Sequence, residues 1–211
     1  MARASRFKGR VNVMGNGNKP YQPHFLSAGK DNETVIKKLF VDDKIYGEML
    51  KRLLVINTPD CLTDLSNVEY IKKIQNTSIK DLREGGYFSF KPRFIQEEHE
   101  TVKSRIITRY QQFSPSLKNE YYLDRIIEFD VLCHVDYWEM DNYQLRPVLI
   151  AGYIDSIMNN AKLTGLGTLK FQGASYLQAS RDWAGYCMIY SSVHGNDDRI
   201  DDDGMIPIFE G

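Results

Sequence analysis

The spacing of the hydrophobic residues changes from helical to strand-like near residue 85. Up to residue 74 they recur at intervals of three and four, which predicts helices. Asp31 or Asn32 is expected to cap the first helix, the second follows Asp43, and Ser66 or Asn67 is expected to cap the third. Beyond residue 85 apolar and polar positions alternate, which predicts strands. The order of elements is therefore helices first and a sheet afterwards.

One long helix interrupts the strand-like region. Pro147 suits the first turn of a helix over Leu145–Asn159, because the amide that proline lacks would be unpaired there. Gly152 inside this helix indicates close packing on a strand or on another subunit. The strands are expected over Tyr87–Phe90, Val102–Tyr110, Ile126–Trp138, Thr168–Gln178 and Trp183–Val193. We predict an α+β fold, with a mixed or antiparallel sheet covered by this central helix and by the N-terminal helices.

The last two predicted strands have apolar or small residues in both phases, which is typical of strands covered on two faces. The two strands before them are expected to form a long hairpin with a loop at Ser114–Asn119. If Ile126–Trp138 is extended throughout, it spans about 43 Å at ~3.3 Å per residue, whereas a common strand has ~5–6 residues. We expect this hairpin to project beyond the domain and to contact a neighbour. Glu128 and Asp130 lie on its polar face, which we expect to be exposed, and both are candidate interface residues.

The two ends of the chain carry opposite charges. Residues 1–30 are rich in glycine, asparagine and proline, and their basic residues include Arg3, Arg6, Lys8 and Arg10. Residues 195–211 are acidic and include Asp201, Asp202 and Asp203. We predict an extended basic arm over 1–30, a single domain over 31–194 and an acidic tail over 195–211. Both ends are candidate segments for binding neighbouring subunits through salt-sensitive surface ion pairs.

The sequence contains no pattern typical of an active site or a metal site. Cys133 and His134 are neighbours on a predicted strand, so their side chains point to opposite faces and form no dyad. On the same strand Asp130, His134 and Asp136 lie ~7–13 Å apart, which is too far for one ion without further ligands. The acidic tail resembles a calcium-binding loop, but Arg199 stands where the first carboxylate ligand belongs. We therefore predict neither catalysis nor a bound cofactor or metal.

The amino-acid composition is typical of many globular proteins and excludes few classes of protein. The chain has 211 residues, of which 42% are hydrophobic and 26% are charged, with a net charge of −1. This is ordinary for a globular protein and argues against general affinity for nucleic acid. The 3 cysteines form no CxxC pair, so neither a disulfide framework nor a zinc site is indicated. We see no secretion signal and no apolar run near the ~20 residues that span a bilayer, and we expect a cytoplasmic origin.

Five strings in the sequence carry a family resemblance. An N-terminal helical region reads ETVIKKLFVDDKIYGEMLKRLLV, and a central strand with its covering helix reads RIIEFDVLCHVDYWEM and LRPVLIAGYIDSIMN. A closing pair of strands reads GLGTLKFQGASYLQ and WAGYCMIYSSVHG. The order and lengths of these elements, together with Arg146-Pro147, Ile150 and Asp155, resemble tail-terminator or neck proteins of tailed bacteriophages. The basic arm and the acidic tail lie outside this resemblance.

The resemblance implies a non-enzymatic virion protein that forms a ring, usually a hexamer, at the end of the tail tube. Its partners would be other copies of the chain, the ring of the head connector, and the tail tube or sheath. Packaged DNA would lie nearby without being bound specifically. Two other hypotheses stay open, namely another tail, tube or baseplate component, and an enzyme or nucleic-acid-binding factor whose site the sequence does not reveal.

Overall fold

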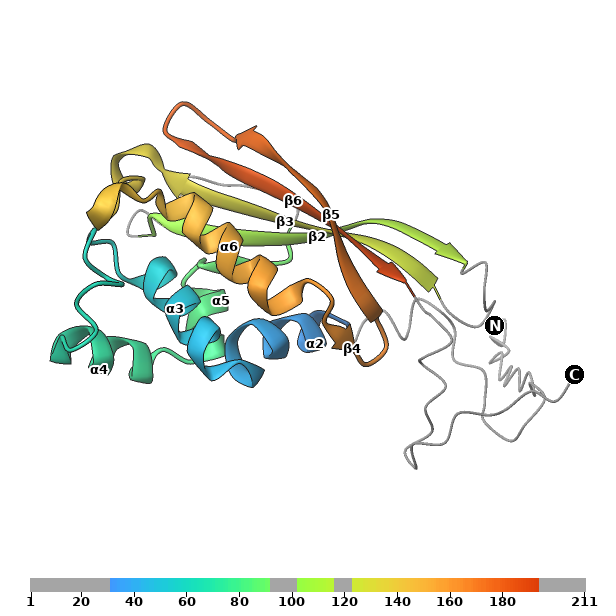
Figure 1. Cartoon of the computed structure of the whole chain (residues 1–211), viewed down its shortest axis with the longest axis horizontal. Helices are drawn as coiled ribbons and strands as arrows, with labels where there is room; N and C mark the ends of the chain where they lie inside the picture. The colour runs from blue at the N-terminus through green and yellow to red at the C-terminus, as the bar shows by residue number, and fades with distance from the viewer. Residues whose placement is uncertain (1–30, 92–101, 116–122, 194–211) are drawn as a thin grey trace, which may run out of the picture.

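The computed structural model describes residues 31–91, 102–115 and 123–193. In this part of the chain a six-stranded sheet with the strand order β1-β2-β3-β6-β5-β4 carries helices on one face (Figure 1). Its strands are β1 (Phe88–Ser89), β2 (Ser104–Pro115), β3 (Leu123–His134), β4 (Lys162–Leu163), β5 (Gly167–Gln178) and β6 (Trp183–Val193). Only β1 and β2 pair in parallel, while all other pairs are antiparallel. The predicted α+β class and mixed sheet are confirmed.

The helices also follow the predicted order. They are α2 (Asp31–Lys37), which continues into a π-helix at Lys38–Asp42, and α3 (Lys44–Val55), α4 (Val68–Asn76), α5 (Ile79–Glu84) and α6 (Arg146–Met158). Asp43 caps α3 and Asn67 caps α4, because each side-chain oxygen accepts from amides of the first turn. Asn67 is one of the two caps expected for α4, and α3 follows Asp43 as predicted. The short helix α5 was not predicted, although Ser78 and Asp81 form a capping box at its start.

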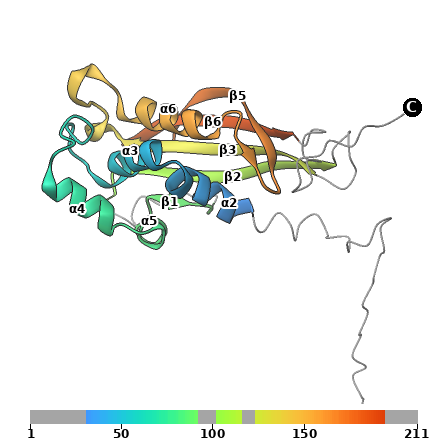
Figure 2. The ribbon, with the colours of Figure 1, turned by 60° about the horizontal axis from the view of Figure 1, so that its bottom comes forward.

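Helix α6 lies across the sheet and closes the main core. Its residues Ile150 and Ile154 are fully buried, and they pack in one cluster with Phe129 and Val131 of β3. Helix α3 lies beside α6, and α2 continues the helical layer towards β4 (Figures 1 and 2). Gly152 is on the outer side of α6, where a Cβ would meet no atom within 4 Å. The expected close packing at Gly152 is therefore wrong within the subunit, since the apolar stripe of α6 turns this position away from the sheet.

The long hairpin of β2 and β3 is confirmed, but β3 ends earlier than predicted. It stops at His134, and Val135–Tyr137 forms a short 3₁₀-helix. The Val135 amide donates to the Asp182 carbonyl at 2.9 Å, and the Trp138 indole donates back to the Cys133 carbonyl at 3.1 Å. These two bonds turn the chain towards α6. At its other end the hairpin extends past α6 (Figures 1 and 2).

Candidate assembly surfaces

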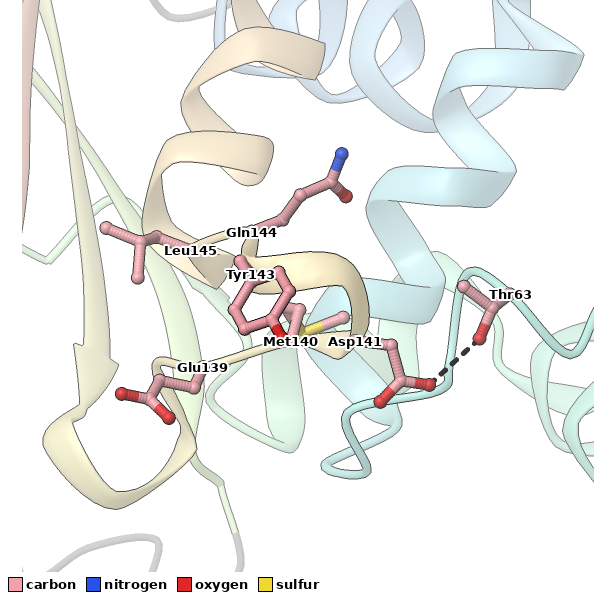
Figure 3. A pocket seen from close by; sticks show the side chains of 7 residues that line it. All are labelled: Thr63, Glu139, Met140, Asp141, Tyr143, Gln144 and Leu145. Carbon is pink, nitrogen blue, oxygen red and sulfur yellow. Dashed lines mark hydrogen bonds between the residues drawn. The ribbon is translucent and has the colours of Figure 1, made fainter.

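A pocket lies at the N-terminal end of α6, next to the loop that follows α3 (Figure 3). It has a volume of about 920 Å³ and is lined by Thr63, Glu139, Met140, Asp141, Tyr143, Gln144 and Leu145. The Thr63 hydroxyl donates to the Asp141 carboxylate at 3.1 Å, which fixes one loop on the other. The carboxylates of Glu139 and Asp141 point away from each other (Figure 3). The two carboxylates of this pocket therefore do not form a pair.

Apolar side chains surround this pocket at the surface. Tyr143 is completely exposed, and its backbone has a φ of 61°, which is unusual for a residue with a bulky side chain. Leu145 and Val148 are 38% and 47% exposed. Such backbone strain persists only where the surrounding structure imposes it, and here the neighbouring residues are fixed by Asp141 and by the buried Arg146. This surface therefore presents both apolar and polar side chains to solvent.

The carboxylates of Glu128 and Asp130 are held inside the subunit by Arg109. The Arg109 guanidinium lies 3.1 Å from Glu128 and 2.7 Å from Asp130, and the two acidic side chains are only 4% and 7% exposed. Arg109 pairs with Glu128 across β2 and β3, so the register of the hairpin brings the three groups together. The expected solvent exposure of this face is therefore wrong at Glu128 and Asp130, because a cross-strand cation allows both to be buried.

Cys187 of β6 completes this cluster. Its sulfur and one oxygen each of Glu128 and Asp130 lie within 4.8 Å of one another, a spacing that could hold a metal ion. Burial, with a smaller contribution from the neighbouring Asp130, raises the pKa of the Cys187 thiol to about 12. The thiol is therefore protonated at neutral pH, and both carboxylates are already paired with the Arg109 guanidinium. These contacts favour an internal ion-pair cluster over a metal site. The interface role of Glu128 and Asp130 stays a prediction, but reversing their charges should now destabilise the fold itself.

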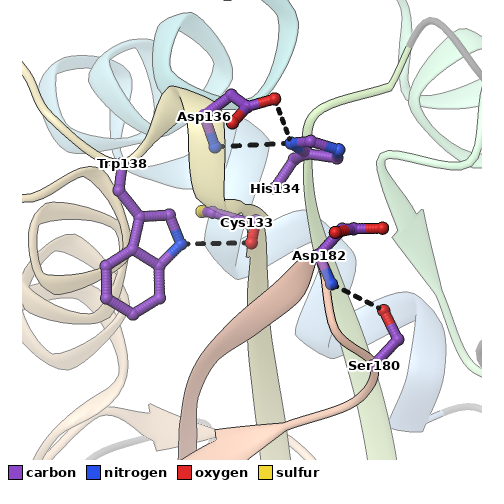
Figure 4. A network of polar contacts seen from close by, with 6 residues as sticks. All are labelled: Cys133, His134, Asp136, Trp138, Ser180 and Asp182. Carbon is purple, nitrogen blue, oxygen red and sulfur yellow. Dashed lines mark hydrogen bonds and ion pairs between the residues drawn. The ribbon is translucent and has the colours of Figure 1, made fainter.

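Polar contacts surround His134, the last residue of β3 (Figure 4). Cys133 is fully buried in the main core, and burial raises its pKa to about 12. The His134 ring lies on the opposite face of β3, edge-on to Trp183 with a centroid distance of 5.7 Å. Its Nδ1 is 3.5 Å from the Asp136 carboxylate, which is largely exposed. Cys133 and His134 therefore form no dyad, as predicted, and Asp130 bonds to Arg109 rather than to His134.

Strand β5 is a surface that the sequence did not predict. From Lys170 to Gln178 its residues are exposed or half-buried, and Phe171 and Tyr176 are 38% and 60% exposed. The expectation that β5 is covered on two faces is wrong, whereas β6 beside it is mostly buried. The reason is strand order: α6 covers the centre of the sheet, and β5 lies near its edge. The small residues of β5 reflect an open edge rather than a buried strand.

The remaining candidate residues lie outside the described part of the chain. These are Arg3, Arg6, Lys8 and Arg10 of the arm and Asp201, Asp202 and Asp203 of the tail. Their role in subunit contacts stays a prediction. Among the helices of residues 31–91, 102–115 and 123–193, none has both the length and the apolar character needed to cross a bilayer.

The sequence profile of the YomW family matches residues 48–192, and this chain belongs to that family. YomW is a phage-derived family, which indicates a phage protein. The matched range begins inside α3 and ends near the end of β6, so it includes the long hairpins and the helix that covers the sheet. Neither the curated proteins nor the solved structures contain a match to this chain.

Proposed function

We propose that this YomW-family protein is a ring-forming structural component of a phage virion, a tail-terminator or neck protein that joins the tail tube to the head connector. The phage-derived family supplies the setting. The order of N-terminal helices, long hairpin, covering helix and closing hairpin supports the specific role, because the resemblance to tail terminators rests on that order. The role is structural and not catalytic.

The observation that carries the proposal is the β2–β3 hairpin, whose outer end passes beyond the helical layer (Figure 1). Each strand has twelve residues, about twice the common length. Gln111 and Gln112 on this outer part are exposed. A hairpin end that reaches past the helices of its own domain is suited to gripping a neighbouring subunit, and a head-to-tail contact of this kind closes into a ring when the rotation fits.

The side chains with potential for chemistry support a structural role. The two carboxylates on β3 are both paired with Arg109, and the Cys133 thiol is buried away from His134. The same geometry also fits a second candidate, another tail, tube or baseplate component, because these parts are rings as well. The two candidates differ in where the protein lies in the particle.

Two measurements test the proposal. The mass of the purified full-length protein in solution, together with negative-stain images, should show closed rings of several copies. Antibody labelling of virions should then place the protein at the junction of head and tail. A protein that stays monomeric over the accessible concentration range would refute the ring, and labelling at the distal end of the tail would favour the baseplate alternative.

A further inference from the structure

Among the described residues, no strand covers one half of the outer edge of β5. Strand β4 pairs only with Gly167 and Thr168 of β5, at one end. The chain carries no charged residue from Phe171 through Ser180. Natural edge strands are normally protected against pairing by charges, prolines or bulges. In the described part of β5 the pairing with β6 contains one such irregularity, between Phe171 and Gly173. An edge this long and this neutral is suited to accepting another strand.

The hydrogen bonds at the end of β5 that pairs with β4 show which backbone groups of β5 point outward. The Leu169 amide donates outward to the Ala161 carbonyl at 3.0 Å. Backbone polar groups alternate in direction along a strand, and the irregularity near Gly173 adds one residue. Beyond it, the outward groups therefore belong to Ala174, Tyr176 and Gln178. These residues lie past the end of β4, and Tyr176 is 60% exposed.

At the other end of the sheet, no described strand other than β1 pairs with the outer edge of β2, and Tyr110 to Ser114 are half-buried or exposed. Strand β1 pairs only with Ile106 and Ile107 of β2, and the Ile106 amide donates to the Tyr87 carbonyl at 2.9 Å. By the same alternation, Thr108 and Tyr110 direct their backbone groups to this side, but Thr108 is only 1% exposed, so the open half of β2 begins at Tyr110. Strands β2 and β5 run in opposite directions, because three successive antiparallel pairings separate them. A second copy in the same orientation would therefore present β2 antiparallel to β5.

We infer that the open half of β5 pairs with the open half of β2 from a second copy of this chain, so that the sheet continues from subunit to subunit. The inference rests on the proposed ring and names the contact that builds it. Each open half has about six residues, or ~20 Å of strand. Head-to-tail pairing fills both open halves of every subunit, whereas pairing of two β5 strands would leave each β2 unpaired.

Charge also favours this partner. The open half of β5 is neutral, and residues 110–115 of β2 carry no charged side chain either. Joining the two edges therefore brings no like charges together. The main-chain hydrogen bonds would supply the attraction, and exposed Tyr176 would add apolar contact.

The first test is a proline on the edge of β5. Ala174→Pro removes an outward amide that bonds to no strand of its own subunit, so melting of the variant should stay near that of the wild type. Its rings should be lost. The matched control is Ser175→Pro, whose amide points inward to β6, and this variant should lose thermal stability as well. Unchanged ring formation by a folded Ala174→Pro protein would overturn the strand pairing.

The second test is cross-linking, which also identifies the partner strand. Tyr176→Cys and Gln112→Cys place thiols on exposed positions of β5 and β2. A short bismaleimide should give dimers when the two variants are co-expressed, ladders with the double variant and no dimer with either variant alone. Wild-type protein, with its native cysteines, gives the background. Dimers from Tyr176→Cys alone would show β5–β5 pairing and overturn the head-to-tail contact.

The mass of the wild-type protein in solution distinguishes a failure of the strand contact from a failure of the proposed function. Wild-type rings together with absent cross-links and an assembling Ala174→Pro variant would overturn the strand contact and leave the ring intact. A wild-type protein that never assembles would overturn both the contact and the proposed function.

Discussion

Replacing Arg146 by methionine tests the contact that joins α6 to the end of α3. The Arg146 side chain is 1% exposed. Its guanidinium donates to the carbonyls of Leu53 and Ile56 at 2.8 and 2.7 Å, to Thr58 at 2.7 Å and to Tyr137 at 3.0 Å. Two of these carbonyls belong to the C-terminal end of α3 and its cap, where the helix dipole favours a positive charge. The charge of Arg146 is therefore balanced by backbone oxygens.

The expected loss of stability follows from these four bonds. A hydrogen bond to a charged group contributes about 1.5–3 kcal/mol, but methionine also removes the cost of burying the guanidinium, and water can reach some of the carbonyls. Each buried carbonyl left without a donor costs about 1–3 kcal/mol, and the bonds to Leu53 and Ile56 are buried. We therefore expect Arg146→Met to cost about 3–5 kcal/mol. For a chain of this size such a loss lowers the melting temperature by roughly 10 °C.

Urea denaturation followed by circular dichroism measures this loss. Arg146→Lys should recover part of it, because an ammonium keeps the charge but cannot reach carbonyls from three segments at once. Arg83→Met, on the exposed side of α5, is the matched control and should change the unfolding free energy by less than about 0.5 kcal/mol. If Arg146→Met costs no more than this control, the four short bonds do not stabilise the fold and the reasoning is wrong.

Further predictions concern two glycines and one buried acid. Gly185→Ala should destabilise the fold by about 1–3 kcal/mol or more, since its Cβ would lie 1.9 Å from the Val131 carbonyl oxygen. Gly152→Ala should stabilise it by up to about 1 kcal/mol, because the position is helical and open; thermal melting compares the pair. Burial raises the pKa of Asp31 from 3.8 to about 6, against the lowering effect of Arg125. Folding therefore favours the protonated acid, so the unfolding free energy should fall by about 1–3 kcal/mol as pH rises from about 4 to about 6. Denaturation at several pH values should show this fall in the wild type and a weaker one in Asp31→Asn, and equal pH profiles would contradict the shift.

Local signals in the sequence were enough to place most of the elements. The predicted bounds of β6 agree with the structure, and α3, α4 and α6 begin within a residue or two of their predicted starts. These elements have a clear apolar period and a recognisable cap or proline at the start. Helix α5 was missed because it has six residues and buries only Leu82. The spacing of Ser78 and Asp81 is the signal that could have revealed it.

The pairing of distant side chains could not be predicted in the same way. The alternation along β3 correctly places Glu128 and Asp130 on one face, but their burial depends on the register that brings Arg109 opposite them. Likewise the small and apolar residues of β5 fit a buried strand as well as an edge strand. Only the strand order, which places β5 beyond the cover of α6, decides between the two. Both errors arise from long-range geometry and not from local propensity.

The pairing of the arginines inside the subunit is related to the neutral edge of β5. Arg146 joins α6 to α3, and Arg125, which is 3.1 Å from Asp31, joins β3 to α2. Arg109 joins β2 to β3. Each of these arginines has its partners inside the subunit, so they fix how the elements pack without leaving charge at the side of β5. A neutral edge gives no electrostatic discrimination between partners. Its specificity would have to come from shape and register, which a rigid sheet fixed by buried ion pairs can supply.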